Sequence, residues 1–234
     1  AALGGHIDRC DNPKCRQLHL SYNSCRNRHC PKCQGHKREA WILARERELL
    51  EVPYFHVVFT LPDTVNRLCL YAPKTVYGIL FKTAWSVLQD FGANPKFLGA
   101  KMGMVAILHT WGQNLSLHPH LHCIVPGGGV SANGKWKYAK NKGKYLFPVK
   151  AMSKVFRARF IANLRTEFDE PQSFYDTLFS KDWVVYAKRP FANPKYVVEY
   201  LGRYTHKIAI SDHRITSLDN GKVSFTAKDY RKGG

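Results

Sequence analysis

Apolar and polar residues either alternate or recur at helical spacing along most of the chain, and these two periods together predict an α+β fold. Short alternating or apolar segments predict strands over residues 54–60, 102–110, 120–125 and 183–187, and a final hairpin of residues 207–216 and 223–230 that turns near Asn220-Gly221. Helix-forming residues and helical spacing predict helices over residues 37–50, 66–91 with a break at Pro73, 151–168, 172–180 and 194–206.

The strand predicted over residues 120–125 carries a candidate metal site. Residues two apart on a strand face the same side, so His120 and His122 present two imidazoles together. If residues 102–110 pair antiparallel with this strand, His109 comes opposite the histidine pair and becomes the third ligand. The amide of Gln113, in the connecting loop, is the alternative third ligand.

The predicted helix over residues 194–206 carries candidate nucleophiles. Tyr200 and Tyr204 are one helical turn apart and share a face of this helix. Together with Tyr196 they also fit a stripe of tyrosines that packs on the sheet, with Tyr196 as the structural member. The presence of the His120 and His122 pair in the chain favours the catalytic interpretation.

A metal next to a tyrosine hydroxyl indicates phosphodiester chemistry. The hydroxyl would attack the phosphate in line, which gives a 5′-phosphotyrosyl enzyme and a free 3′-OH, while the metal offsets charge on the phosphate. Neutral imidazoles would leave a bound Mg²⁺ or Mn²⁺ with its full charge. The chain has no Gly-x4-Gly-Lys-Ser/Thr motif, and we expect no nucleotide cofactor because the adduct conserves the bond energy. We expect His118 to lie behind the ligands or face DNA, and His56 to be a core residue.

Charge indicates a polyanionic partner. The chain has 36 Lys+Arg against 17 Asp+Glu, a formal net charge of +19, and no carboxylate between Asp90 and Glu167. Lysines there alternate with Trp136, Tyr138, Tyr145 and Phe147, as expected of a surface that stacks unpaired bases. The alternative is a solvated lysine-rich hairpin. The residues that we expect to contact DNA are Arg26, Arg28, Lys135, Trp136, Lys137, Lys140, Lys142, Lys144 and Arg203.

Five of the seven cysteines fall in the first 33 residues. The spacing predicts a zinc site of Cys10, Cys15, Cys30 and Cys33. Cys25 is an alternative ligand, and His6, His29 and His36 are weaker alternatives. Such a small segment buries little core, so structural Zn²⁺ would supply most of its folding energy. A disulfide framework is the competing interpretation, and the odd cysteine count and the lack of a signal peptide disfavour it. Cys69 and Cys123 are expected in the core.

Several segments together resemble the HUH endonuclease superfamily, and in detail the two-tyrosine rolling-circle transposases of the insertion sequence ninety-one family. They are residues 22–33 (YNSCRNRHCPKC), 55–62 (FHVVFTLP), 108–112 (LHTWG), 119–122 (PHLH) and 200–206 (YLGRYTH). The spacing of Cys10 and Cys15 is wider than the two-residue gap expected in relatives.

The resemblance implies an HUH palm, in which helices flank a central antiparallel sheet, preceded by a small zinc ribbon. It implies a ribbon over residues 1–40, a tyrosine nuclease domain over residues 41–234, and further helices beyond residue 234. It also implies nicking and joining of single-stranded DNA at hairpin-bearing element ends, with Tyr200 and Tyr204 as nucleophiles, and it supports His109 as third ligand. No window is long and apolar enough for a membrane span, so we expect the protein on the nucleoid in the cytoplasm.

Two other classes of protein fit part of the pattern. A replication initiator or relaxase would share the site chemistry, but the cysteine-rich segment fits a transposase better. A non-catalytic zinc-ribbon DNA-binding protein would keep its DNA function without the tyrosines. A transposase that uses a carboxylate triad is disfavoured, because the central part of the chain has no acidic residues.

Overall fold

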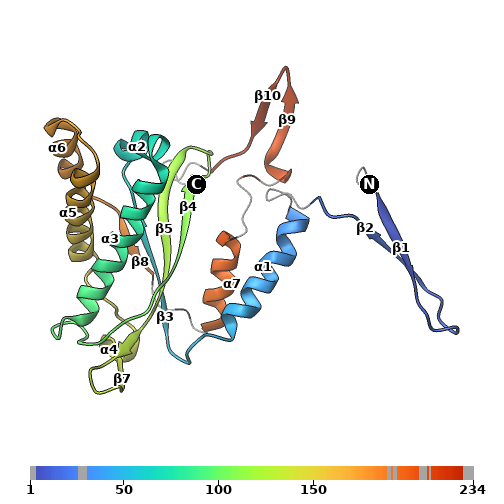
Figure 1. The fold of residues 1–234 in the computed structure, drawn as a ribbon, viewed down its shortest axis with the longest axis horizontal. Helices are drawn as coiled ribbons and strands as arrows, with labels where there is room; N and C mark the ends of the chain where they lie inside the picture. Colours follow the sequence, from blue (N-terminus) through green and yellow to red (C-terminus); the bar gives the residue numbers. More distant parts are fainter. Residues whose placement is uncertain are drawn as a thin grey trace.

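The computed structural model describes residues 4–25, 31–188, 191, 194–205, 210 and 212–228, with the side chains of residues 31, 32, 36, 194, 195, 201, 203–205 and 212 left out. At its centre is a four-stranded antiparallel sheet with the strand order β4-β5-β3-β8 (Figure 1). The strands are β3 (Tyr54–Thr60), β4 (Val105–Trp111), β5 (Leu117–Pro126) and β8 (Val185–Ala187). The predicted α+β class and the central antiparallel sheet are therefore confirmed.

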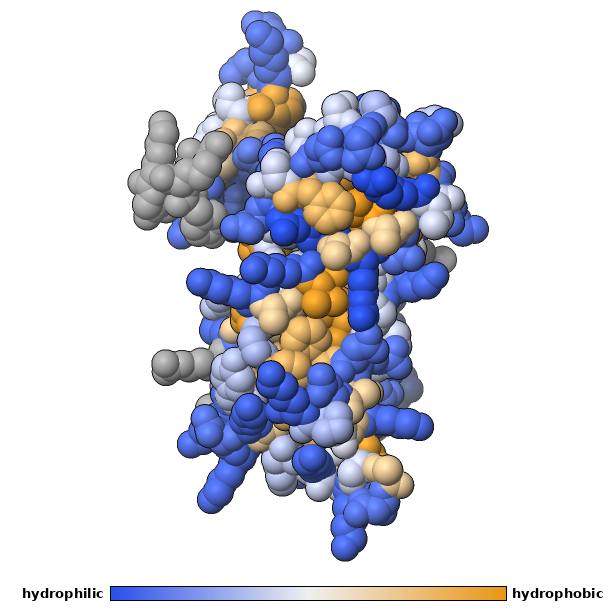
Figure 2. Space-filling view, turned by 90° about the vertical axis from the view of Figure 1, so that its left-hand side faces the viewer, coloured by the Kyte–Doolittle hydropathy of each residue, from blue (hydrophilic) through white to orange (hydrophobic). Residues whose placement is uncertain are grey.

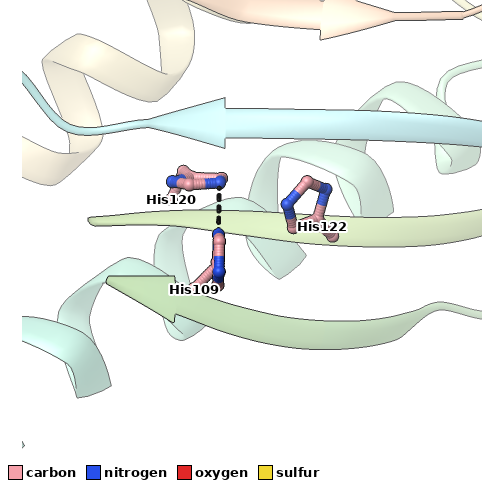
Figure 3. Close-up of side chains that lie close together, drawn as sticks. All are labelled: His109, His120 and His122. Atoms are coloured by element: carbon pink, nitrogen blue, oxygen red, sulfur yellow. Dashed lines mark hydrogen bonds between the residues drawn. The ribbon is translucent and has the colours of Figure 1, made fainter. Parts of the chain in front are cut away.

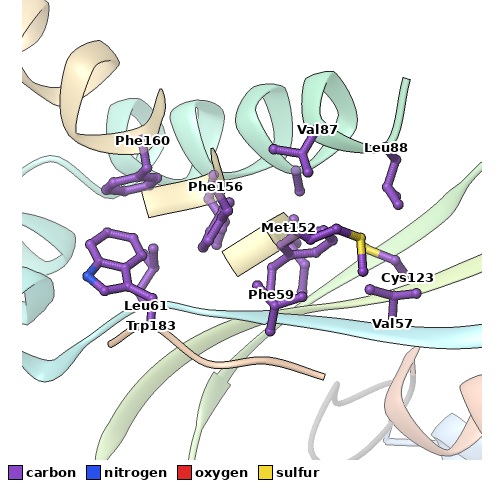
Figure 4. Packing of buried hydrophobic residues seen from close by; sticks show 14 of the residues in the cluster. Val57, Phe59, Leu61, Val87, Leu88, Cys123, Met152, Phe156, Phe160 and Trp183 are labelled. Atoms are coloured by element: carbon purple, nitrogen blue, oxygen red, sulfur yellow. The ribbon is translucent and has the colours of Figure 1, made fainter. Parts of the chain in front are cut away.

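One face of the sheet is covered by a layer of helices. These are α2 (Asn66–Tyr71), α3 (Pro73–Ala93), α5 (Val149–Glu167) and α6 (Gln172–Ser180). Alternate residues of β3 and β5, among them Val57, Phe59 and Cys123, point into this layer and are fully buried against Phe156 and Met152 (Figure 4). The outer surface of this side of the molecule is hydrophilic around a central apolar strip (Figure 2).

The other face of the sheet is covered by α1 (Pro31–Glu46) and α7 (Pro194–Thr205), which pack against each other (Figure 1). A smaller core lies here, with Tyr54 and Ile124 from the sheet and Val197 and Val198 from α7. The helices cross closely at Gly202, where an added Cβ would lie 2.6 Å from Cδ1 of Ile42. Gly202 therefore sets the distance between the two helices.

Three hairpins extend from these layers. Near the N-terminus β1 (Gly5–Arg9) pairs with β2 (Leu18–Tyr22) and projects away from the sheet (Figure 1). After β5, β6 (Gly128–Val130) pairs with β7 (Trp136–Tyr138), and α4 (Lys140–Gly143) follows. Near the C-terminus β9 (Ile215–Asp219) pairs with β10 (Lys222–Phe225) through the predicted Asn220-Gly221 turn, where both residues have positive φ. The remaining short elements are the 3-10 helices η1 (Asp63–Val65) and η2 (Asp212–Arg214).

Most predicted elements match the structure, including the helix break at Pro73, but several boundaries differ. The first long helix begins earlier, at Pro31, and ends at Glu46, because the chain turns there to enter β3 and the Tyr54 hydroxyl accepts the amide hydrogen of Leu50 (2.9 Å). The glycines after β5 end that strand and also begin the next one. Gly128 and Gly129 form β6, where an added Cβ on Gly129 would lie 2.3 Å from the Lys101 carbonyl oxygen.

The prediction that Phe147 belongs to a base-stacking surface is wrong. Its side chain is buried, and its ring lies 5.5 Å from that of Phe91 and 6.1 Å from that of Phe97. The prediction that Cys69 and Cys123 are core residues is confirmed, because both are buried. No helix within the described residues is long and apolar enough to cross a membrane.

Candidate active site and metal centre

The structure brings His109, His120 and His122 together on the sheet face that α1 and α7 cover. His109 pairs directly with His120 across β4 and β5, as the antiparallel arrangement predicts (Figure 3). Nδ1 of His109 lies 3.2 Å from Nε2 of His120, and one potential ligand atom from each of the three rings lies within 4.8 Å of the others. Two nitrogens on one metal, at bonds of about 2.1 Å and angles near 90–109°, would be about 3.0–3.4 Å apart. The spacing of His109 and His120 fits this range.

Backbone contact fixes the orientation of His120. Its Nδ1 donates a hydrogen bond to the carbonyl oxygen of His118 at 2.6 Å, which leaves Nε2 as the atom with the lone pair. Burial lowers the pKa of His120, so the neutral ring is favoured. His118 itself is exposed. Of the two expected places for His118, only its backbone carbonyl group lies behind a proposed ligand, His120, while its ring is exposed.

The third ring, His122, contacts a fourth histidine. Nε2 of His56, on β3, lies 2.8 Å from Nδ1 of His122, and the two rings stack with centroids 5.1 Å apart and planes 13° apart. Burial, with Lys188 and His120 nearby, lowers the pKa of His56 to about 4. His56 was expected only as a core residue. It is buried as expected, but it also contacts His122 of the three-histidine cluster, which the strand periodicity alone did not indicate.

Tyr200 lies beside this pair of rings. Its ring meets that of His56 edge to face, with centroids 5.0 Å apart, and lies 5.6 Å from the ring of Phe191. Tyr196, one turn earlier on α7, is 55% exposed and does not pack on the sheet. The side chains of Tyr204 and Arg203 lie outside the described residues. Of the two tyrosine side chains that the structure describes on α7, that of Tyr200 contacts His56 and that of Tyr196 is exposed.

The donor set is suited to a divalent cation. Three imidazole nitrogens bind divalent transition metals, and they leave coordination positions open for water or a phosphate oxygen. Mg²⁺ prefers oxygen ligands and would depend more on those open positions. Gln113 lies in the turn after β4, and its backbone carbonyl oxygen accepts a hydrogen bond from the Arg214 guanidinium at 2.5 Å.

The cysteines of the N-terminal segment are spread over both ends of the β1–β2 hairpin. Cys10 and Cys15 are exposed at its tip. Sγ of Cys25 lies 3.4 Å from Sγ of Cys33, which also lies 2.9 Å from Oγ of Ser24, beyond the other end of the hairpin. Five strand pairs separate the two ends by about 17 Å. The structure thus brings Cys25 to Cys33 and not to Cys10, and Cys30 lies outside the described residues.

The predicted DNA-contacting lysines lie away from the histidines. All five lysines are exposed, and they lie on β7, α4 and their flanking turns, at the end of the sheet opposite the β4–β5 turn (Figure 1): Lys135, Lys137, Lys140, Lys142 and Lys144. Trp136 is half-buried, and an added Cβ on Gly128 would lie 2.8 Å from its indole. Arg26 and Arg28 lie outside the described residues.

A cavity lies on the same face of the sheet as the histidines, but none of these histidines lines it. It measures about 200 Å³ and lies between α1, α7 and the sheet, lined among others by Trp41, Tyr54, Ile124 and Val197. Its walls are mainly apolar, so it offers none of the chemistry of the histidine cluster.

Comparison with known proteins agrees with the sequence motifs. Residues 103–234, more than half of the chain, match the family described as "Putative transposase", and residues 1–61 match the family described as "Transposase zinc-binding domain". The chain is 45% identical to "Putative transposase y4qJ" of Sinorhizobium fredii, with all of the chain and 62% of that protein covered. It is 30% identical to "Transposase for insertion sequence element IS801" of Pseudomonas savastanoi pv. phaseolicola, with 95% of the chain and 56% of that protein covered.

Among solved structures, the chain is similar to the conjugative relaxase TrwC. The structure of TrwC complexed with a 27-mer DNA comprising the recognition hairpin and the cleavage site matches with a TM-score of 0.38 and 13% identity, over 75% of this chain and 68% of that one. A metal-free complex of TrwC with OriT DNA matches with a TM-score of 0.40 and 12% identity, over 48% and 44%.

The family matches and the similarity to two transposases extend over both the cysteine-rich segment and the part with the histidines and tyrosines. The chain spans about three fifths of the length of the two transposases. It belongs to the insertion sequence ninety-one family of transposases and carries that family's zinc-binding domain at its N-terminus.

Proposed function

We propose that this chain is the nuclease part of a rolling-circle transposase, which nicks single-stranded DNA at element ends and rejoins it through a 5′-phosphotyrosine. The observation that carries the proposal is the position of Tyr200 against His56, whose ring is hydrogen-bonded to His122 of the three-histidine cluster. A tyrosine hydroxyl close to a metal centre is a suitable nucleophile for a phosphodiester.

The three histidines would hold the cation, Mg²⁺ or Mn²⁺, through Nε2 of His120 and of His122 and Nδ1 of His109. When bound, the cation would withdraw negative charge from the scissile phosphate and help to orient it. The hydrogen bonds to the His118 carbonyl oxygen and to His56 involve Nδ1 of His120 and Nδ1 of His122, and they would hold each ring in one orientation toward the cation.

The tyrosines would do the bond making. The hydroxyl oxygen of Tyr200 attacks phosphorus and loses its proton. The bond between phosphorus and the O3′ atom of the preceding nucleotide breaks, and this oxygen takes up a proton to become the free 3′-OH. A 3′-OH can later attack the same phosphorus and release the tyrosine, so no nucleotide is consumed. Tyr204, one turn further along α7, would let the same site hold one strand while it attacks another.

The N-terminal segment would hold a structural zinc. Both strands of the β1–β2 hairpin are mostly exposed, including Ile7 and Leu18, so the hairpin has little core of its own. Metal binding would supply the missing folding energy. The close approach of Cys25 to Cys33 supports these two thiolates as ligands, with Cys10, Cys15 and Cys30 as the further candidates.

The lysine-bearing end of the sheet would hold DNA that extends from the cleavage site. Along β5, His122 and Pro126 are about 14 Å apart, and the lysines of β7 and α4 follow beyond that point. They would therefore contact phosphates several nucleotides from the scissile one, in single-stranded DNA or in a hairpin at the element end. Acting on such DNA, the protein would work on the nucleoid, in the cytoplasm.

A covalent trapping experiment tests the proposal. The chain is incubated with Mn²⁺ and a single-stranded oligonucleotide pool of random sequence, labelled at the 3′ end, and resolved on a denaturing gel. A 5′-phosphotyrosine retains the 3′ fragment, so the protein band becomes labelled, whereas a 5′-end label would leave with the other fragment.

The matched variants are Tyr200→Phe, Tyr204→Phe, the double variant, His120→Ala, and Tyr196→Phe as a control for an exposed tyrosine on the same helix. We expect the labelled band to require Mn²⁺, to disappear in the double variant and in His120→Ala, and to persist in Tyr196→Phe. DNA binding that is retained by the double variant, with no band from the wild-type chain, would instead support a non-catalytic zinc-ribbon protein.

A further inference from the structure

His56 is a polar residue in an otherwise mostly apolar strand. It lies on β3, opposite Ile124 of β5, and its side chain is 3% exposed. A buried imidazole needs polar partners, because an unsatisfied ring nitrogen in the interior is costly. The contacts of His56 therefore indicate what it does.

The first contact fixes the tautomer of a metal ligand. Nε2 of His56 and Nδ1 of His122 are 2.8 Å apart, so one ring donates to the other. For His122 to offer the lone pair of its buried Nε2 to a cation, its proton must be on Nδ1, and this proton is donated to Nε2 of His56. The near-parallel stacking of the rings, at 13°, also fixes the plane of the His122 imidazole.

The second contact is with the proposed nucleophile. The ring of Tyr200 meets the His56 ring edge to face, at 65° with centroids 5.0 Å apart. Edge-to-face packing is a favoured geometry of aromatic rings, so His56 restricts how Tyr200 can rotate. One side chain thus contacts both a metal ligand and the tyrosine.

We propose that His56 is a positioning residue that sets the tautomer of His122 through its Nε2 and the orientation of Tyr200 through its ring. This inference rests on the proposed function, since it assigns a role within the same site. In this role His56 would contact neither the cation nor the DNA.

The choice of histidine has a chemical consequence. Metal-bound histidines commonly donate their second N–H to a carboxylate, which makes the ligand more electron-rich. A neutral imidazole in that place donates less electron density, so more positive charge remains on the cation to act on the phosphate.

Two substitutions separate the two contacts. His56→Gln places an amide oxygen near the position of Nε2 and keeps an acceptor for His122, but it removes the ring that Tyr200 contacts. His56→Phe keeps a ring for Tyr200 and removes the acceptor. For each variant we would measure the Mn²⁺ dissociation constant, from the paramagnetic resonance signal of free Mn²⁺, and the rate of covalent adduct formation at saturating Mn²⁺. Circular dichroism verifies that each variant is folded.

We expect opposite defects in the two variants. His56→Phe should weaken Mn²⁺ binding by about tenfold or more, the usual effect of losing such a partner, and should form the adduct faster than His56→Gln once Mn²⁺ is saturating. His56→Gln should bind Mn²⁺ within about threefold of wild type, but its adduct rate should fall about tenfold because Tyr200 is less well oriented.

The proposal is overturned if both folded variants bind Mn²⁺ as the wild type does, or if both show the same loss in both measurements. The failure of the proposed function looks different. In that case the wild-type chain forms no adduct at all, while the difference in Mn²⁺ affinity between the Phe and Gln variants can still be measured.

Discussion

The crossing of α1 and α7 at Gly202 provides a quantitative test of the packing that holds the tyrosine helix. An alanine Cβ at this position would lie 2.6 Å from Cδ1 and 2.7 Å from Cγ1 of Ile42, whereas carbon atoms in contact prefer about 3.5–4.0 Å. Ile42 or the helix must therefore move by about 1 Å. Overpacking of this kind costs about 1–3 kcal/mol, and we expect the lower half of that range because Ile42 is only half-buried.

The matched control is Gly78→Ala in α3, where an added Cβ meets nothing within 4 Å. Both substitutions gain about 1 kcal/mol of helix propensity, so the control should be stabilised by that amount. Gly202→Ala should be less stable than the control by about 1–2 kcal/mol. At about 2–4 °C per kcal/mol for a chain of this size, the difference in melting temperature should be several degrees.

Thermal unfolding followed by circular dichroism measures this difference. When Ile42→Ala is the reference, adding Gly202→Ala should cost little stability, because the clashing Cδ1 and Cγ1 atoms are gone. Since Tyr200 lies on α7, Gly202→Ala should also slow adduct formation, whereas Gly78→Ala should not. Equal stabilisation by both glycine substitutions would refute the close crossing of the two helices.

Two further predictions concern titratable groups. The pKa of His56 is about 4 in the folded chain and near 6.5 when unfolded, so the unfolded state binds more protons between these values, and the free energy of unfolding should fall by about 3 kcal/mol as pH drops from 6.5 to 4. In chemical unfolding of the metal-free chain, His56→Gln should show a shallower fall; an unchanged slope would contradict the assignment. Burial raises the pKa of Cys69 to about 11 and also raises that of Cys123, so a thiol reagent at pH 8 should spare both and label exposed Cys10 and Cys15 unless Zn²⁺ is bound. Mass spectrometry of the labelled peptides tests this, and labelling of Cys123 in the folded chain would count against the buried core.

Local sequence signals predicted the parts of the site that local geometry controls. The two-residue period of a strand places His120 and His122 on one face, and a short antiparallel connection brings His109 opposite them, as observed. The Pro73 break and the Asn220-Gly221 turn follow equally from the backbone preferences of single residues.

Contacts between distant segments could not be predicted in this way. His56 and His122 are 66 residues apart, and they meet only because β3 pairs with β5. The sequence did contain a hint of this role, because His56 lies in the apolar segment of residues 54–60 and points to the same face as Tyr54. What that face contacts becomes known only once α1 and α7 are seen to cover it. Phe147 was misassigned for the same reason. Its lysine neighbours in the sequence are exposed, but its own ring packs against Phe91 and Phe97, which come from a different part of the chain.

The central claim is that a tyrosine of α7, beside the histidine cluster, joins covalently to DNA. The most direct measurement is peptide mapping of the trapped protein–DNA adduct by mass spectrometry after nuclease and protease digestion. The account predicts a nucleotide attached through its 5′ phosphate to Tyr200 or Tyr204, and only when Mn²⁺ or Mg²⁺ is present. A nucleotide attached to another residue, to Tyr196 in particular, or an adduct that forms equally well without a metal, would contradict it.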